Sequence, residues 1–457
     1  MRKFSKKIHM AGIGGAGMSP LAEVLLSHGH KISGSDTRCS EVTRYLERIG
    51  IPVQYSHTPQ YVRNADILVF SSAIKKDNPE RIYADKNGIV SIRRAEALGQ
   101  VMRDKYTICI AGTHGKTTTT SMTGEVFRAA GTKPTILGGG KLRDNLSFAT
   151  TGTGNVMIAE ADEYDRSFLA MYPSVAIITN IEADHLDCYE SIDAIKDAFI
   201  EFCNRVPFYG AVIACKDDCG VSGILPDIHK TIITYATGCE ADYTAEKITF
   251  EKRKTVFSVR KYGDVIGRIC LSVPGLHNVK NSLAVVATAS EMGIDFETIS
   301  SALASFNGVS RRFEIVGEIN GISVIDDYAH HPAEIDATIN AARSCGCKRI
   351  VAVFQPHLYS RTRDFVNEFA ESLSKADKVF VSDIYKAREE PQPGISSKNI
   401  VCKIHELGNS NAWYEPQKEM LIEIVRNILE NGDTVIFMGA GDIGECAEIL
   451  VERIKNG

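Results

Sequence analysis

Several features that would restrict the class of this protein are missing from its sequence. There is no uninterrupted apolar stretch long enough to cross a membrane, so we expect no membrane insertion. The first ten residues are basic but run into a glycine-rich turn instead of the apolar segment of a signal peptide, which favours a cytoplasmic location. The formal net charge is only −5, which argues against a general nucleic-acid or anionic-membrane partner.

Neither a disulfide framework nor a cysteine-rich metal site is predicted. The twelve cysteines are scattered, and the closest groupings, Cys345 with Cys347 and Cys215 with Cys219, have no second pair at metal-binding spacing. We therefore expect reduced thiols. Repeats and low-complexity linkers are also lacking. A length of 457 residues with 44% hydrophobic and 24% charged residues predicts a globular protein of two or three domains, each with its own core.

The most informative segment that is present is a glycine turn ending in Lys-Thr. An apolar run at residues 108–111 precedes it, and a helical pattern follows. Glycines let backbone N–H groups face phosphate oxygens, while the lysine supplies a cation and the threonine a Mg²⁺ ligand. An ordinary strand-to-helix turn is the alternative. The predicted nucleotide-binding residues are Gly112, Thr113, His114, Gly115, Lys116, Thr117 and Thr118.

A second glycine turn lies near the N-terminus, after an apolar run at residues 7–11. Gly12, Gly14, Gly15 and Gly17 lead into a helical pattern, and Asp36 stands where a carboxylate could meet a ribose hydroxyl. A dinucleotide site is the default interpretation, although any diphosphate, including that of a nucleotide sugar, suits a helix N-terminus, and a purely structural turn stays possible. The strand predicted at residues 67–70 ends in Ser71 and Ser72, whose hydroxyls could face the same ligand.

Acidic clusters follow two further predicted strands, at residues 156–160 and 175–180. The first cluster begins at Glu160, and the second includes His185. Carboxylates beside a phosphate loop predict Mg²⁺, because hard oxygen ligands complete the shell that Thr117 and the phosphates begin. A solvated acidic surface is the alternative. Imidazole is not a usual Mg²⁺ ligand, so chemistry alone would make His185 a structural residue.

The last third of the chain predicts another α/β block. A hairpin is expected around Asn320 and Gly321. Strands are predicted at residues 323–327, 349–354, 378–381 and 434–438, and helices at 333–343, 364–374 and 416–429. The turn at Gly439 and Gly441 is expected to join a strand to a helix, with another nucleotide site as the alternative.

Eight motifs, taken in order, resemble one known family, the Mur ligases of peptidoglycan synthesis. The motifs are Gly12–Ser19, Gly112–Thr117, Glu160–Glu163, Thr179–His185, His277-Asn278 with Asn281, Arg311–Phe313, Asp326–Pro332 and Gln355–Thr362. They span the whole chain. The resemblance implies a three-domain α/β fold: a Rossmann-like UDP-sugar-binding domain (1–105), a P-loop ATPase-like central domain (106–313) and a Rossmann-like amino-acid-binding domain (314–457).

The resemblance also implies the reaction, in which ATP drives the joining of L-alanine to the lactyl carboxylate of UDP-N-acetylmuramate through an acyl phosphate. Thr117 and Glu160 would ligate the Mg²⁺ on ATP, and His185 would join a second Mg²⁺. The ATP site would add Asn180, His277, Asn281, Arg312 and Asp326. The sugar-nucleotide and alanine sites would comprise Gly12, Gly14, Gly15, Ala16, Gly17, Met18, Ser19, Asp36, Ser71, Ser72, Tyr328, His330, His357 and Arg361. Catalysis would rest on Lys116, Glu160, His185, His330 and Arg361, with His330 assisting deprotonation of the amine.

Two positions depart from the family pattern. Leu358 stands where the common form has arginine, so one cation on the substrate side is missing or supplied elsewhere. Sister ligases carry a carbamylated lysine downstream of the metal-site histidine, whereas Lys196 lies at an unsuitable offset here, in agreement with the alanine-adding branch.

Three other functions would use part of these motifs. A recycling ligase that attaches a whole tripeptide to the same sugar nucleotide has a bulkier glycine turn than Gly14–Gly17. A NAD-dependent dehydrogenase would leave Lys116 without a role. A non-catalytic UDP-sugar sensor would need neither Glu160 nor Arg361. Oligomeric state and the preference among L-alanine, glycine and L-serine are not predicted.

Overall fold

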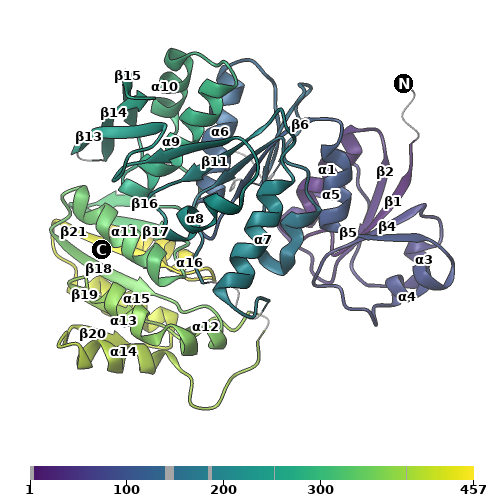
Figure 1. Ribbon diagram of the computed structural model, residues 1–457. Coiled ribbons are helices and arrows are strands. Elements are labelled where there is room, and N and C mark those ends of the chain that lie inside the picture. The colour runs from purple at the N-terminus through teal and green to yellow at the C-terminus, as the bar shows by residue number, and fades with distance from the viewer. Residues whose placement is uncertain (1–4, 139–148, 184–187, 252, 388, 457) are drawn as a thin grey trace. The chain divides into compact units, whose positions relative to one another are not determined.

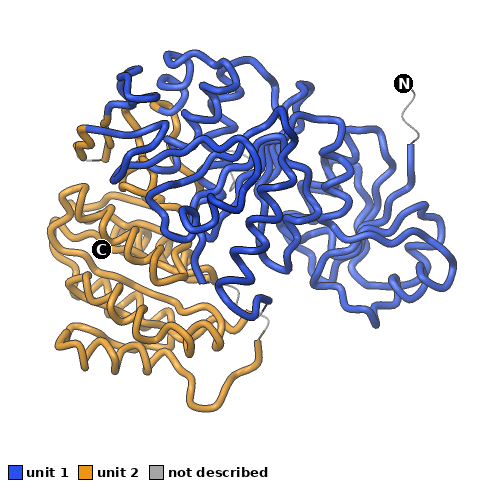
Figure 2. Tube along the Cα trace, viewed as in Figure 1, with its two compact units in different colours: residues 1–246, 258–268, 280–303 blue, residues 247–257, 269–279, 304–457 orange. Residues whose placement is uncertain are grey.

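The computed structural model of the protein describes residues 5–138, 149–183, 188–251, 253–387 and 389–456. The chain forms two compact units, which Figure 2 distinguishes by colour. Unit 1 comprises residues 1–246, 258–268 and 280–303, and unit 2 comprises residues 247–257, 269–279 and 304–457. In both, strands alternate with helices (Figure 1), so the predicted α/β class is confirmed.

The first sheet of unit 1 has five parallel strands in the order β3-β2-β1-β4-β5. Its strands are β1 (Lys7–Ala11), β2 (Lys31–Ser35), β3 (Val53–Gln54), β4 (Ile67–Phe70) and β5 (Val90–Arg93). Its helices are α1 (Met18–Ser27), α2 (Glu41–Arg48), α3 (Pro59–Val62), α4 (Pro79–Lys86) and α5 (Arg94–Met102). The strand order reverses between β1 and β4, and ligands of open α/β sheets bind at such a reversal. The glycine turn after β1 and the serines after β4 both lie there.

The second sheet has ten strands in the order β15-β14-β13-β12-β11-β10-β6-β9-β7-β8. They are β6 (Tyr106–Ala111), β7 (Thr135–Leu137), β8 (Ala149–Thr150), β9 (Val156–Glu160), β10 (Val175–Ile178), β11 (Ala211–Cys215), β12 (Ile232–Ala236), β13 (Tyr243–Glu251), β14 (Lys254–Lys261) and β15 (Asp264–Leu271). The parallel strands β9, β6 and β10 are neighbours, with Glu160 opposite Ile110 and Ile178 opposite Ala111. The phosphate loop and both acidic clusters therefore leave the sheet at one edge.

The elements connected with this sheet are α6 (Lys116–Ala129), the 3₁₀ segment η1 (Tyr164–Ala170), α7 (Ile192–Asn204), α8 (Cys219–Ile224), η2 (Leu225–Asp227), α9 (Leu276–Glu291) and α10 (Phe296–Ser305). Side chains cap several helices in this half of the chain, namely α2 by Ser40, α4 by Asn78, α7 by Ser191 and α8 by Asp218. By contrast, α1 and α6 begin after Gly17 and Gly115 without a side-chain cap or an acidic first turn. Their first N–H groups are therefore suited to an anion.

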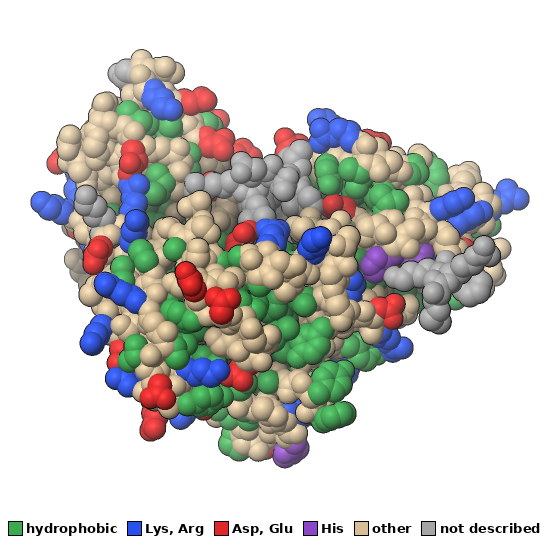
Figure 3. Space-filling model, turned by 90° about the horizontal axis from the view of Figure 1, so that it is seen from above, with side chains coloured by type: hydrophobic (Ala, Val, Ile, Leu, Met, Phe, Trp, Pro, Cys, Tyr) green, Lys and Arg blue, Asp and Glu red, His purple; other side chains and the backbone are tan. Residues whose placement is uncertain are grey.

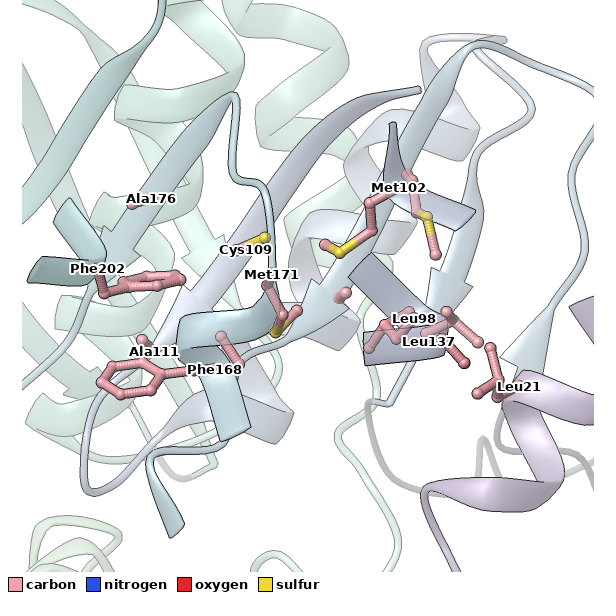
Figure 4. Close-up of a cluster of buried hydrophobic side chains, with 14 of the residues drawn as sticks. Leu21, Leu98, Met102, Cys109, Ala111, Leu137, Phe168, Met171, Ala176 and Phe202 are labelled. Carbon is pink, nitrogen blue, oxygen red and sulfur yellow. The ribbon is translucent and has the colours of Figure 1, made fainter. Parts of the chain in front are cut away.

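One apolar core extends through both sheets of unit 1. It includes Leu21 of α1, Leu98 of α5, Cys109 of β6, Phe168 of η1 and Phe202 of α7, which Figure 4 labels. Phe168 stacks on Phe202 with 4.8 Å between ring centroids. Because protein cores are close-packed, the elements that carry the glycine turn and the phosphate loop belong to one packed body.

Unit 2 contains a six-stranded sheet in the order β16-β17-β21-β18-β19-β20, antiparallel only between β16 and β17. Its strands are β16 (Glu314–Ile319), β17 (Ile322–Asp327), β18 (Arg349–Phe354), β19 (Lys378–Val381), β20 (Ala412–Tyr414) and β21 (Asp433–Met438). Its helices are α11 (Pro332–Ser344), α12 (Tyr359–Asp364), α13 (Val366–Leu373), α14 (Ser397–Glu406), α15 (Lys418–Ile428) and α16 (Gly444–Lys455). Successive residues of β17, Val324 and Ile325, enter two different apolar clusters, so both faces of the sheet are buried.

The strands, the hairpin and the helices predicted for the last third of the chain are confirmed. Strands β4, β18 and β19 have the predicted bounds. The hairpin between β16 and β17 turns at Asn320 and Gly321, with φ of 51° and 76°. The helix predicted at residues 364–374 is found as α13, which begins two residues later because the chain breaks from α12 at Phe365 with φ −121°.

The surface and the cysteines agree with the composition. Acidic and basic side chains are interspersed over the face drawn in Figure 3. None of the described helices combines the length and apolarity needed to cross a membrane. All twelve cysteines are free thiols in this structure.

Candidate active site

The loop between β6 and α6 has the backbone that a phosphate cradle requires. Gly112 and Gly115 have φ of 137° and 83°, where glycine is favoured. A Cβ on Gly112 would lie 2.0 Å from Thr179 Oγ1, so no larger residue fits. The His114 N–H donates to Asn180 Oδ1 at 2.7 Å, which fastens the loop to the segment after β10. The predicted turn is therefore fixed against the residues that follow β10.

Two asparagines expected around the adenine lie against this loop. Asn180 also accepts a hydrogen bond from the Thr113 N–H, through its backbone carbonyl oxygen, at 3.1 Å. Asn281 of α9 stands so close that a Cβ on Gly115 would lie 2.8 Å from its Oδ1. The structure thus brings both residues to the loop, and their contact with a base stays a prediction.

The Lys116 ammonium is surrounded by oxygen atoms. Nζ donates to Gly112 O at 2.6 Å, to Thr113 O at 3.2 Å and to the Glu163 carboxylate at 2.8 and 3.1 Å. Burial acts to lower the pKa of Lys116, but attraction to Glu163 and Asp162 outweighs it and the pKa is raised. Lys116 is therefore a fixed cation at the start of α6, as phosphate binding requires.

Glu160, at the end of β9, suits a metal ion. Its Oε1 is buried and accepts no hydrogen bond from any residue that the structure describes. A buried carboxylate oxygen without a donor is costly unless a cation meets it. Helix α6, which carries Thr117 and Thr118 in its first turn, packs against β9. His185, the remaining metal candidate, lies outside the described residues.

The N-terminal glycine turn is shaped by Asp36. Its Oδ2 accepts the Gly14 N–H at 2.9 Å, and a Cβ on Gly14 would lie 2.9 Å from the same oxygen. The carboxylate predicted to meet a ribose hydroxyl thus already orders the turn itself. Gly15, Ala16 and Gly17 are exposed, whereas Met18 and Ser19 are buried in α1. Residues 15–17 are therefore accessible to a ligand from solvent, whereas Met18 and Ser19 are not.

An arginine that the sequence analysis missed lies beside this turn. A Cβ on Gly17 would be 2.9 Å from Arg94 Nη1. Arg94 lines a cavity of about 140 Å³ together with Ser72, Asp162 and Tyr164. Burial lowers the pKa of Arg94, and attraction to Asp162 opposes this shift. The guanidinium has no hydrogen bond or ion pair with any described residue. Such a cation favours an anionic ligand.

The carboxyl ends of the central strands of unit 2 carry a second group of predicted residues. Asp326 pairs with Arg311, whose Nε lies 3.0 Å from Oδ2. Burial raises the pKa of Asp326 while Arg311 opposes the rise. Arg311 also donates to the carbonyls of Gly439 and Gly441 at 2.7 and 3.1 Å. The turn after β21 is thereby held by Arg311 and leads into α16.

Arg312 instead approaches Glu334, with 3.2 Å between Nη1 and Oε1. Its guanidinium also lies over the Tyr328 ring, 5.3 Å from the centroid. His277 belongs to the same unit, and burial, followed by repulsion from Arg312, lowers its pKa to about 4. The imidazole is therefore neutral at physiological pH, so one ring nitrogen can donate a hydrogen bond and the other can accept one.

The structure brings three predicted substrate residues together in an aromatic row. Ring centroids are 5.4 Å apart for Tyr328 and His330, 5.9 Å for His330 and His357, and 5.9 Å for His357 and Tyr385. His330 Nδ1 lies 3.0 Å from Tyr328 O and 3.1 Å from a Glu334 carboxylate oxygen. Glu334 thus orients His330, and the row can border a small polar substrate.

Leu358, the departure from the family pattern, has an unusual backbone. Its φ is 71° and its ψ 140°, a conformation that favours glycine, and the side chain is buried. The Leu358 N–H donates to Tyr385 O at 3.0 Å, which holds the segment in place. Arg361 follows in α12 and is also buried. Arg361 is the one arginine of the motif at residues 355–362, and its contact with the substrate stays a prediction.

Three partners were missed for different reasons. Arg94 follows another arginine at a helix start, which is an ordinary surface pattern. Glu163 was noticed only as part of an acidic cluster. Tyr385 follows β19, far from His357 in sequence, and no sequence signal connects the two.

Comparison with known proteins matches three successive Mur ligase profiles. They are the Mur ligase family catalytic domain at residues 7–106, the Mur ligase middle domain at 110–289 and the Mur ligase glutamate ligase domain at 311–441. A UDP-N-acetylmuramate–L-alanine ligase of Salinibacter ruber is 46% identical over 453 residues, covering 99% of this chain and 95% of the relative.

Solved structures give the same result. The crystal structure of UDP-N-acetylmuramate–alanine ligase from Thermotoga maritima is similar with a TM-score of 0.83 and 30% identity, covering 99% of both chains. A murein peptide ligase from Psychrobacter arcticus is similar with a TM-score of 0.71 and 25% identity, again over 99% of both chains. The predicted Mur ligase fold is thereby confirmed.

Proposed function

The chain belongs to the Mur ligase family, and we propose that it joins L-alanine to the lactyl carboxylate of UDP-N-acetylmuramate with hydrolysis of ATP to ADP and phosphate. The observation that carries the proposal is the 46% identity over nearly the whole chain with a ligase of that name. The site geometry agrees with it, because the phosphate loop and Glu160, whose buried Oε1 accepts no hydrogen bond from a described residue, leave the same edge of the sheet. ATP is the energy source because a free carboxylate is a poor electrophile.

The chemistry proceeds in two steps. A carboxylate oxygen attacks the γ-phosphorus of ATP, the bond to the bridging oxygen breaks, and ADP leaves. The neutral amine of alanine then attacks the acyl carbon, the bond to phosphate breaks, and the amine loses a proton. The first step brings two negative groups together, and in the second step negative charge develops on the acyl oxygen and the departing phosphate, so positioned cations lower both barriers.

The phosphate loop supplies much of that positive charge. The loop N–H groups, the start of α6 and Lys116 would hold the β- and γ-phosphates, with Thr113, His114, Thr117 and Thr118 completing the cradle. Thr117 and Glu160 would hold Mg²⁺, which fits the buried oxygen of Glu160 that accepts no hydrogen bond. The ion would neutralise phosphate charge when bound. We retain His185 as a second-metal residue on resemblance alone.

The glycine turn would hold the diphosphate of the sugar nucleotide. The exposed residues 15–17, Ser71 and Ser72 border the strand-order reversal, and Arg94 adds a cation there. In unit 2, Tyr328, His330, His357 and Arg361 would face the muramyl carboxylate and alanine. His330 is our candidate to take the amine proton, since Glu334 orients its ring.

Several finer assignments belong to the same proposal. His277, Asn180 and Asn281 would surround the adenine, with Arg312 and Asp326 binding ribose and phosphates. The domain bounds are 1–105, 106–313 and 314–457. We place the reaction in the cytoplasm, where ATP is available.

The experiment incubates the protein with ATP, Mg²⁺ and UDP-N-acetylmuramate and adds L-alanine, glycine, L-serine or the tripeptide of the recycling reaction. Phosphate release and product mass are measured. We expect release with L-alanine and a product larger by one alanine residue. Turnover with the tripeptide and none with alanine would identify the recycling ligase, and turnover with neither would contradict the proposal.

A further inference from the structure

The contact between Lys116 and Glu163 bears on how the loop takes up a nucleotide. An ammonium group has three N–H donors. Two loop carbonyls, Gly112 O and Thr113 O, and the Glu163 carboxylate provide acceptors for all three. A phosphate oxygen that binds Nζ must therefore replace or share one of these acceptors.

Glu163 is the acceptor that can be exchanged without rebuilding the loop. Gly112 and Thr113 precede Lys116 in the same turn, so their carbonyls belong to the cradle. Glu163 comes from the segment after β9 and reaches the ammonium through its side chain. Carboxylate and phosphate oxygens both accept strong charge-assisted hydrogen bonds from ammonium. The two anions thus compete for one cation.

Glu163 is enclosed by the protein, and its backbone is anchored. Glu163 is only 3% exposed, and the buried Tyr189 donates its O–H to the Glu163 carbonyl at 2.7 Å. Ion pairs shielded from water interact more strongly than exposed ones. The raised pKa of Lys116 agrees with such a pair, because attraction to Glu163 is the largest of the effects that raise it against burial.

We propose that Glu163 is a positioning residue that competes with the β- and γ-phosphates of the nucleotide for Lys116 and thereby sets the affinity of the loop. The inference rests on the proposed function, since it takes ATP as the ligand of this loop. Its consequence is directional: removing the charge of Glu163 strengthens binding of nucleotides that reach Lys116. A residue that bound Mg²⁺ or substrate would have the opposite effect.

The test measures nucleotide affinity by calorimetry for wild type and Glu163→Gln, with ADP and AMP in Mg²⁺ buffer. We expect about tenfold tighter ADP binding in the variant, equivalent to about 1.4 kcal/mol. AMP affinity stays unchanged because AMP lacks the β-phosphate that reaches Lys116. Unchanged or weaker ADP binding, or equal tightening of AMP, overturns the inference.

Two matched variants separate the contact from general electrostatics. Asp162→Asn removes the same charge from the exposed neighbouring residue, which has no hydrogen bond to Nζ, and is expected to change ADP affinity less than about twofold. In a Lys116→Met background, Glu163→Gln is expected to have no effect. Tightening that persists without Lys116, or that Asp162→Asn reproduces, contradicts the competition.

Glu163→Asp keeps the inference testable if the glutamine variant fails to fold. The shorter side chain withdraws the carboxylate from Nζ, so ADP binding is expected to tighten by about threefold. No change in this variant also overturns the inference. Wild-type protein that binds neither nucleotide would instead contradict the proposed function, and the two failures are thus distinguishable.

Discussion

The half-buried imidazole of His277 makes a stability prediction that needs no substrate. Burial, with repulsion from Arg312, lowers the pKa of His277 to about 4 in the folded chain, whereas an unfolded histidine titrates near about 6.5. Between these values the unfolded chain binds a proton that the folded chain excludes. Stability from this residue is therefore complete above pH about 6.5 and is lost as the pH falls toward about 4.

The size of the effect follows from the shift. Each pKa unit corresponds to about 1.4 kcal/mol, so His277 changes the free energy of unfolding by up to about 3 kcal/mol across this window. Asp327, in the same unit, acts in the opposite direction, because burial raises its pKa to about 6 against the attraction of Arg312. The wild-type curve alone therefore mixes two terms of opposite sign.

Comparison with His277→Gln isolates the histidine. The one tryptophan, Trp413, stacks on Phe380 in unit 2, so its fluorescence reports unfolding of the unit that contains His277. Urea unfolding is measured between about pH 7.5 and 4.5. The stability of wild type relative to the variant is expected to fall with pH by up to about 3 kcal/mol. A constant difference would show that His277 is not buried as a neutral ring.

Three substitutions in unit 1 test the assigned roles. Lys116→Ala is expected to lower phosphate release at least about a hundredfold while UDP-sugar binding measured by calorimetry persists, and activity close to wild type would remove the phosphate-loop assignment. Glu160→Ala is expected to shift the Mg²⁺ dependence of turnover to higher concentration, and superimposed titrations would show that it is no ligand. Arg94→Ala is expected to raise the KM for UDP-N-acetylmuramate about tenfold and leave that for ATP unchanged. Its control, Arg93→Ala, removes the adjacent exposed arginine, and an equal effect of both would deny Arg94 a specific role.

Elements with strong local signals were predictable from the sequence. The runs that became β4, β18 and β19 are short, apolar and bounded by polar residues, so their limits were found correctly. The turn at Asn320 and Gly321 has its own residue signature. Long-range pairing is different, because no local pattern distinguishes Arg311 from Arg312 as the partner of Asp326.

The site residues divide in the same way. Gly112 and Lys116 were found because a phosphate loop is continuous in sequence. Glu163 and Arg94 act from other segments, where an acid in an acidic cluster or an arginine at a helix start has many ordinary explanations. The break between α12 and α13 depends on the backbone at Phe365, to which helical periodicity is insensitive.

The central claim is that the carboxylate of UDP-N-acetylmuramate is phosphorylated before alanine reacts. Positional isotope exchange tests it directly, with ATP labelled by ¹⁸O at the β–γ bridge. If the acyl phosphate forms reversibly, the β-phosphate of ADP rotates before the bond re-forms, and the label moves to a non-bridging position. Omission of the sugar nucleotide and the Lys116→Ala variant serve as controls.

We predict that the label scrambles with UDP-N-acetylmuramate present and alanine absent, and that either control stops the exchange. Scrambling only after alanine is added would show that the amine must bind before phosphoryl transfer. Scrambling without any acceptor would indicate reversal of simple ATP hydrolysis and would contradict the ligase mechanism proposed for this chain.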